Sequence, residues 1–464
     1  MMLHRRDAMI RLGQIGAGAV TLPGLLSMER TARAENSRHQ LIRSEGHAKS
    51  CILIYLWGGP PQQDMWDMKP EAPEGIRSLF KPIPTIVPGI DVCDQMPLFA
   101  KHTDKTAIIR SFSHESNVHE PSVYRTLTGR TDPTKVIPRN ARNRQDPPTI
   151  GSVVGSFLPT ENMPGSVTIP RPIGHDGITY SGTYGGFLGA KYDPMEMQNA
   201  GETKETPTHS LALPSDMQVA RLQSRKGLLQ LIEEQDRRFQ TVRHAQSMDS
   251  FREQAFSMLS STRAKEAFDI NSEDPRVRDR YGRNEWGEAI LMARRLVESG
   301  VRLVTISWMY IQKSGNVANV WDNHGPFEGK NGTEMLQQTY CIPSLDQGYS
   351  ALMEDLSATG LLDETLVAMY GEFGRTPKIN KSIGRDHWGA CQSAVLAGGG
   401  IRGGQVYGSS DKEAAYPKSN PVSPEDMLAT MYYSLGISPE SLIYDQFDRP
   451  HRLVEGRPLV ELFS

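Results

Sequence analysis

The sequence is poor in cysteine and lacks a block of basic residues, and each absence excludes classes of function. The 4 cysteines among the 464 residues lie far apart and form no Cys-x-x-Cys pair, which argues against a thiolate metal site and a thiol redox motif. A disulfide between two of them is left open. Because the formal net charge is −3, the sequence indicates neither a nucleic-acid-binding surface nor a patch for acidic lipids. We expect no nucleic-acid partner.

The sequence also lacks a stretch with the length and continuity of a membrane span. The apolar stretch at residues 15–28 is short and is interrupted by Gly and Pro. This stretch follows the paired Arg5 and Arg6 and precedes the small-x-small sequence at residues 32–34. The order of charged region, apolar region and cleavage site predicts an export signal, and the paired arginines resemble the twin-arginine type. The alternative is an amphipathic tail. We therefore expect a periplasmic or secreted protein with no integral span in the mature chain.

Continuous apolar runs are present instead, and they are typical of strands that are buried on both faces of a parallel sheet. Helical spacing over residues 285–300 and 345–362 places a helix before two of these runs. This helix–strand alternation predicts a doubly wound α/β fold, with a mainly parallel sheet flanked by helices, in which ligands bind beyond the carboxyl ends of the strands. The predicted strands are residues 51–57, 106–112, 301–308, 365–370 and 393–400.

One region differs in composition from the rest of the chain. Residues 131–214 are rich in Pro and Gly and are expected to form ordered loops that cap the sheet edge, whereas residues 215–268 are polar and are expected to form a helical pair. The predicted organisation is therefore a signal peptide at 1–34 and one domain at 35–464, with an insertion at about 131–268.

Carboxylate and imidazole side chains follow several of the predicted strands. Because the carboxyl ends of parallel strands meet at one edge of a sheet, these side chains are expected to lie at one rim. Mixed nitrogen and oxygen ligands suit Zn²⁺ or Mn²⁺ better than Ca²⁺, and their number suits one or two ions. The alternative is a polar loop network without metal. The candidate ligands are Asp64, His114, His119, Asp322, His324, Glu372, Asp386 and His387.

The segment "GEFGRTPKINKSIGRDHW" at residues 371–388 supplies three of these candidates. We expect Glu372 to lie at the end of the strand 365–370, and the loop that follows to fold over the site and return Asp386 and His387 as further ligands. Arg375 is a candidate clamp for anionic oxygens, because its planar fork matches sulfate or phosphate. Its alternative role is a salt bridge across the loop.

Two stretches carry a resemblance to known families. "HEPSVYRTLTGR" at 119–130 resembles the C/S-x-P-S-R-x-x-x-x-T-G-R signature of sulfatases, and "TLVAMYGEFG" is similar to the strand-plus-Asp-His-Gly segment of the alkaline phosphatase and sulfatase superfamily, with Glu372 where Asp usually stands. Over nearly the full mature chain, the sequence closely resembles the twin-arginine-exported proteins classed as domain of unknown function 1501. The resemblance implies an alkaline-phosphatase-like fold.

The departures from the sulfatase signature change the expected chemistry. His119 stands where a sulfatase has its cysteine or serine nucleophile, and Val123 replaces the signature arginine. Because imidazole cannot form an aldehyde hydrate, a formylglycine mechanism is not expected. Three roles remain open for His119: a metal ligand, a nucleophile that forms a phosphohistidine, or a general acid. Metal ligation fits best. Ser122 is expected to cap the following helix.

Two functions follow from these expectations. The first is an exported hydrolase of phosphate or sulfate esters on small molecules, polysaccharide or lipid, in which a divalent ion activates water and His119 and Arg375 act in catalysis. The second is a non-catalytic metal-binding or envelope-associated binding protein of the same fold, which the loss of the nucleophile favours.

Overall fold

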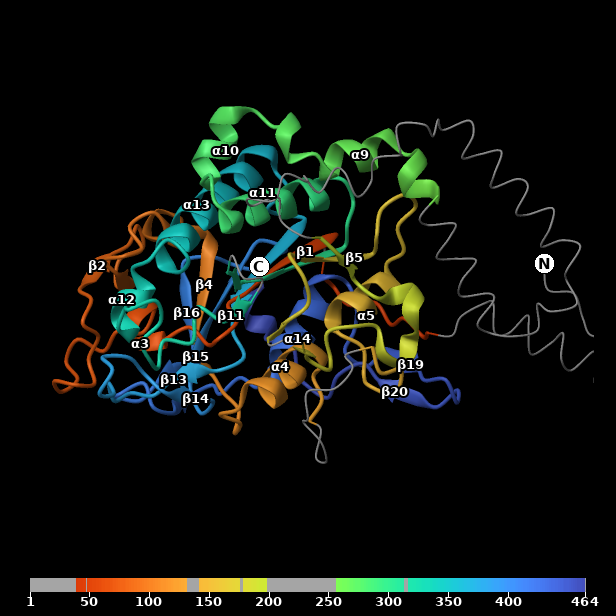
Figure 1. Cartoon of the computed structure of the whole chain (residues 1–464). Coiled ribbons are helices and arrows are strands. Elements are labelled where there is room, and N and C mark those ends of the chain that lie inside the picture. The colour runs from red at the N-terminus through yellow and green to blue at the C-terminus, as the bar shows by residue number, and fades with distance from the viewer. Residues whose placement is uncertain are drawn as a thin grey trace, which may run out of the picture.

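The computed structural model describes residues 39–46, 48–131, 142–175, 178–197, 256–312 and 316–463. Its centre is an 8-stranded sheet in which β15 alone runs antiparallel to its neighbours, so that the sheet is mainly parallel (Figure 1). All five predicted strands lie in this sheet. Its strands, in spatial order, are β16 (Gln405–Tyr407), β4 (Thr106–Phe112), β15 (Gln392–Ala397), β12 (Thr365–Tyr370), β1 (Ser50–Tyr55), β9 (Leu303–Ser307), β5 (Ser166–Ile169) and β8 (Met195–Glu196).

Helices cover both faces of the sheet, as the alternation of helices and strands predicts. Along β1, Ile52 and Ile54 pack under α11 (Glu285–Glu298) and α13 (Ile342–Thr359). Leu53 and Tyr55 point to the opposite face, which α4 (His119–Thr128), α5 (Ile150–Phe157) and α14 (Pro424–Ser434) cover. Figure 1 shows the two helical layers above and below the strands. The fold is therefore doubly wound α/β.

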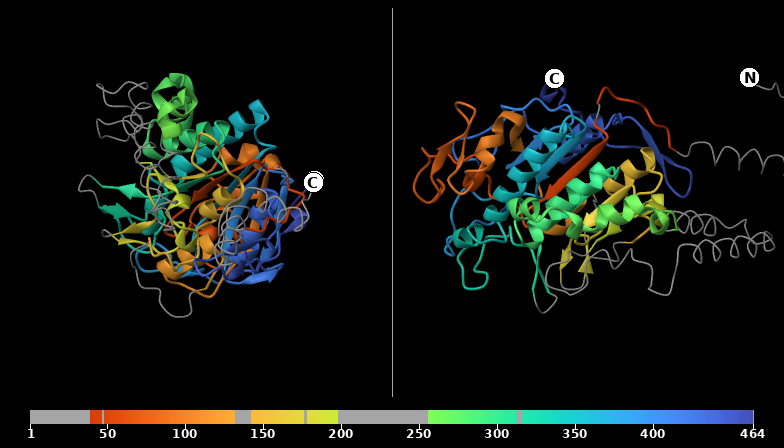
Figure 2. Two further views of the ribbon diagram at one scale, coloured as in Figure 1. Left: turned by 90° about the vertical axis from the view of Figure 1, so that its right-hand side faces the viewer. Right: turned by 90° about the horizontal axis from the view of Figure 1, so that it is seen from above.

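The two predicted helices end as their sequences suggest. The side chain of Asn284 accepts a hydrogen bond from the Gly287 N–H and caps the start of α11, while Gly360 closes α13 in the left-handed conformation with φ of 74°. Two further helices, α9 (Thr262–Phe268) and α10 (Pro275–Tyr281), lie on the side of the sheet opposite to the C-terminal segment (Figure 2).

The Pro- and Gly-rich region is more regular than the sequence suggests. It contains α5 and two short strands that extend the main sheet, since β5 pairs with β9 and β8 pairs with β5. The prediction of loops was wrong at these positions, because four-residue and two-residue strands give almost no periodic signal. The predicted helical pair lies largely outside the described residues, and so does the predicted signal peptide.

Short elements complete the described chain. Among the helices that the structure describes, none has both the length and the apolar character that a membrane span requires. The 4 cysteines are buried and have free thiols. The short helices are α3 (Gln62–Met65), α12 (Gly332–Leu336), η1 (Phe99–Lys105), η2 (Gly186–Leu188), η3 (Ala190–Tyr192), η5 (Ile270–Ser272) and η6 (Val460–Leu462). The two-stranded pairs are β2 (Pro82–Pro84) with β3 (Asp91–Cys93), β6 (Gly174–His175) with β7 (Ile178–Thr179), β10 (Tyr310–Ile311) with β11 (Val317–Ala318), β13 (Gly374–Arg375) with β14 (His387–Trp388), β17 (Ser409–Ser410) with β18 (Pro417–Ser419), and β19 (Leu442–Tyr444) with β20 (Pro450–Arg452).

Candidate metal centre

The structure brings together His119, Asp322 and His387, whose ligand atoms lie within 4.8 Å of one another. His119 begins helix α4, Asp322 lies in the loop that follows β11, and His387 begins β14. The Nε2 atom of His119 is 3.2 Å from Asp322 Oδ2, and that of His387 is 3.0 Å from Asp322 Oδ1. These residues follow β4, β9 and β12, whose carboxyl ends share one edge of the sheet.

The other nitrogen of each imidazole faces a hydrogen-bond acceptor. His119 Nδ1 lies 2.7 Å from Glu372 Oε1, and His387 Nδ1 lies 3.0 Å from the carbonyl oxygen of Asn117. A carboxylate and a carbonyl only accept, so each Nδ1 carries a hydrogen, and in its neutral form each ring presents its Nε2 lone pair to Asp322. A lone pair that faces a carboxylate is repelled unless a proton or a cation lies between them. This donor set fits a divalent metal, because a histidine ligand usually donates its other N–H to a carboxylate or a carbonyl.

The charges around this group favour an ionised carboxylate. Burial would raise the pKa of Asp322, but the Arg375 guanidinium at 2.5 Å and the surrounding imidazoles hold it well below its ordinary value. Burial likewise opposes the charged form of His119, yet its hydrogen bonds to Asp322 and Glu372 outweigh burial and raise the pKa of His119 to about 9. At neutral pH a proton therefore lies between His119 and Asp322, at the place where a cation would bind.

Glu372 lies behind His119. Its side chain is fully buried and also accepts hydrogen bonds from the Gly58 N–H at 2.9 and 3.1 Å. Gly58 has φ of 119°, and a Cβ there would lie 2.4 Å from the backbone nitrogen of Asp322, so glycine is required at this position. The sequence suggests a direct ligand at Glu372, whereas the structure gives it contacts that orient His119.

His324 lies at the solvent side of the cluster. Its Nε2 is 3.2 Å from Asp322 Oδ2, its ring is 5.3 Å from that of His387, and its side chain is 49% exposed. It stands next to the three-residue group as an accessible imidazole. His324 can therefore act either as a fourth nitrogen ligand or as a proton donor.

The remaining candidate ligands have other partners. Asp64 accepts two hydrogen bonds from the Arg385 guanidinium, at 2.8 and 3.1 Å. His114 donates from Nε2 to the Glu372 carbonyl at 2.5 Å and accepts the Ser116 N–H at Nδ1. The exposed Asp386 accepts from Asn380 at 2.9 Å. None of these three residues joins the group that the structure assembles, and ligation by them stays a prediction.

The loop after β12 returns as expected, but it contributes one residue to the group. Arg375 and His387 are paired across the β13–β14 ladder, which brings His387 back beside the end of β12. Asp386 and His387 are adjacent, yet their side chains have different partners, Asn380 for Asp386 and Asp322 for His387. His387 therefore faces Asp322, and Asp386 does not.

Arg375 is fully buried and its N–H groups are used within the protein. It donates to the carbonyls of Gly59 and Arg385, both at 2.9 Å, and to the carboxylate of Asp322. Further hydrogen bonds go to the carbonyls of Gly58 and Trp321. This environment matches the salt-bridge alternative, because the guanidinium has no exposed edge to offer an anion.

Several residues at the site escaped the sequence reasoning. Asn319 Nδ2 lies 3.2 Å from both Asp322 Oδ2 and His119 Nε2, and the Phe373 ring packs at 4.9 Å from His119 and 4.6 Å from His387. Asn117 acts through its backbone carbonyl, for which no side-chain signal exists. Ser122 was predicted to cap helix α4, but the helix begins at His119, so Ser122 lies inside its first turns and is fully buried.

One of three comparisons with known proteins identifies a family. A family model described as "Protein of unknown function (DUF1501)" matches residues 48–463. A search of curated proteins finds no match. Among solved structures, a protein in the alkaline phosphatase superfamily from Vibrio parahaemolyticus shares 9% identity over 92% of this chain and 73% of that chain, with a TM-score of 0.39. A phosphonate monoester hydrolase from Silicibacter pomeroyi shares 11% over 89% and 76%, with a TM-score of 0.38. A 2-O GAG sulfatase shares 11% over 90% and 74%, with a TM-score of 0.41.

Proposed function

The chain belongs to the DUF1501 family of proteins of unknown function, and from this premise we propose that it is a metal-dependent hydrolase of phosphate or sulfate esters. The observation that carries the proposal is the orientation of two imidazoles. His119 and His387 are fixed through Nδ1 by Glu372 and by the Asn117 carbonyl, so both Nε2 atoms converge on the carboxylate of Asp322.

Each residue of the group has a defined role in this proposal. His119, Asp322 and His387 would hold one divalent ion, Zn²⁺ or Mn²⁺, since two imidazoles and one carboxylate are a typical donor set for these metals. Such an ion, when bound, would lower the pKa of its water from 15.7 to about 7, which is the chemistry that it would supply at neutral pH. Glu372 orients His119, and Arg375 keeps Asp322 ionised and in place. The half-exposed side chain of His324 can give a proton to the departing ester oxygen.

A non-catalytic metal-binding protein is the second candidate, and two observations favour it. The nucleophile position of the sulfatase signature holds His119, whose nitrogens both have partners, and Ser122 is fully buried one turn further into the helix. Arg375 is unavailable to an anionic substrate because its donors are already used.

Metal analysis combined with an ester panel separates the two candidates. Protein loaded with Zn²⁺ or Mn²⁺ should hydrolyse an aryl phosphate or an aryl sulfate, and a chelator should abolish the activity. Stoichiometric bound metal without turnover of any aryl or sugar ester would favour the binding protein. Absence of metal binding would contradict both.

We also propose that the chain is exported by the twin-arginine route, because Arg5 and Arg6 precede the apolar stretch and the small-x-small sequence. Replacement of both arginines by lysine should keep the precursor in the cytoplasm. Secretion of a mature form that starts near Glu35 in this variant would contradict the proposal.

A further inference from the structure

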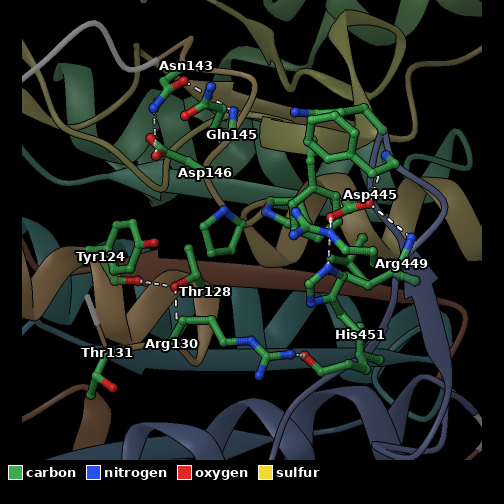
Figure 3. Close-up of a pocket in the computed structure, with 18 residues that line it drawn as sticks. Tyr124, Thr128, Arg130, Thr131, Asn143, Gln145, Asp146, Asp445, Arg449 and His451 are labelled. Atoms are coloured by element: carbon green, nitrogen blue, oxygen red, sulfur yellow. Dashed lines mark hydrogen bonds and ion pairs between the residues drawn. The ribbon is translucent and has the colours of Figure 1, made fainter. Parts of the chain in front are cut away.

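A cavity of 680 Å³ lies at the C-terminal end of helix α4 (Figure 3). His119 of the metal centre begins the same helix and so stands at its N-terminal end. The helix has 10 residues, so its two ends are about 15 Å apart. Residues 143–148 ahead of α5 form one wall, and the β19–β20 hairpin forms another. No residue of the metal centre lines the cavity, so it is a separate site whose volume falls in the range of small-molecule sites.

Polar side chains reach this cavity from opposite sides, as Figure 3 shows. Asn143 and Gln145 lie on one side and are exposed. Arg449 and His451 lie on the other and flank Asp445, which they contact at 2.6 and 3.2 Å. Amides, guanidinium groups and carboxylates together offer both donors and acceptors around one space. A ligand that carries many hydroxyl groups needs this mixture, because each hydroxyl both donates and accepts.

Aromatic rings complete the lining. Phe447 is 67% exposed, and the Arg449 guanidinium covers its ring at 5.0 Å. Phe187 stacks on the ring of His451 with centroids 5.2 Å apart and planes 27° apart. These rings are flat apolar surfaces beside the polar groups, and they suit a ligand that has apolar C–H faces and polar edges.

From these observations we infer that the cavity binds a carbohydrate of two or three sugar units. The sugar rings lie against Phe447 and Phe187, and their hydroxyl groups bond to Gln145, Asn143 and Arg449. The inference does not depend on the metal centre, since none of these residues touches it. It adds a carbohydrate-binding site to the proposed hydrolase and equally to the non-catalytic alternative.

Calorimetric titration of the purified protein tests the inference, with a chelator present so that the metal centre holds no ion. A neutral trisaccharide, maltotriose, and an acidic one, trigalacturonic acid, distinguish hydroxyl recognition from charge recognition at the same site. Binding of either supports the inference. Failure of both to bind at millimolar concentration overturns it, and so does preferential binding of inorganic sulfate or of adenosine monophosphate.

Variants locate the binding to this cavity. Phe447→Ser should weaken the affinity about tenfold, since a well-placed aromatic contact contributes this much. Gln145→Ala should weaken it about threefold or more through the loss of one hydrogen bond. Both positions are exposed, so the fold should be retained. Tyr416→Ser is the matched control, because Tyr416 is 54% exposed and lies outside the cavity. Equal affinity in all three variants and the wild type overturns the inference.

Discussion

The Nδ1 atom of His119 lies 2.7 Å from Oε1 of Glu372, although the two residues are 253 positions apart in the sequence. This contact fixes which nitrogen of His119 faces Asp322, and it therefore decides whether the residue can hold a metal ion. It also gives Glu372 a role that can be separated from ligation by measurement.

Glu372→Gln should lower the affinity for Zn²⁺ by about ten- to a hundredfold, as expected for the loss of a carboxylate that orients a ligating histidine. The three ligand atoms themselves remain. Competition with a metal-sensitive dye measures the effect, and Asp386→Asn is the control because Asp386 is exposed and lies outside the group. Complete loss of metal binding in Glu372→Gln would instead indicate that Glu372 is a direct ligand.

His387→Ala should reduce bound metal and, in metal-loaded protein, the melting temperature together, because a ligand that binds only the native state stabilises it. Lys381→Ala changes an exposed residue of the same loop and should alter neither quantity. Elemental analysis and thermal denaturation with and without a chelator measure both. Full occupancy in His387→Ala would show that this loop is no part of a metal site.

The fold could be predicted from the sequence because its strands are continuous apolar runs. β4 and β12 have the predicted bounds, and α11 ends just before Gly300. β5 and β8 could not be predicted, since strands this short are recognised only by their pairing, of β5 with β9 and of β8 with β5.

The site was predictable in position and less so in its details. His119, Asp322 and His387 follow strands whose ends share one edge, and topology alone brings them near one another. Topology does not determine side-chain contacts. Asp64 follows β1 in the same way, yet it pairs with Arg385, and the backbone carbonyl that orients His387 has no signature in the sequence.

Arg375→Met should destabilise the protein by about 3–5 kcal/mol, because it leaves the carboxylate of Asp322 and several carbonyls buried without their donor. Urea denaturation of metal-free protein measures this change in the free energy of unfolding. Arg402→Met, at an exposed arginine, controls for the loss of one charge. A change below about 1 kcal/mol, the range of surface ion pairs, would contradict the buried role.

Asp346 of helix α13 should make the free energy of unfolding depend on pH, independently of metal binding. Burial raises its pKa to about 6, although its carboxylate accepts the N–H groups of Leu98 and Phe99 at 3.1 and 2.6 Å. Since the folded pKa lies above the unfolded value of about 3.9, the unfolded state loses its proton first. The contribution of Asp346 to stability is therefore complete below about pH 4 and is lost as the pH rises through about 6.

The size of this loss is about 3 kcal/mol, from two pKa units at 1.36 kcal/mol each. Asp346→Asn removes the titration, so the free energy of unfolding of the wild type should fall relative to this variant between about pH 4 and 7 and then stay level. Urea denaturation of metal-free protein across this range measures the difference. The exposed Asp363→Asn controls for the removal of one carboxylate, and its difference from the wild type should lack this fall. The prediction is wrong if the difference in the free energy of unfolding between wild type and Asp346→Asn is constant with pH. In that case the Asp346 carboxylate is as well stabilised in the folded chain as in the unfolded one, because its hydrogen bonds with Leu98 and Phe99 offset its burial.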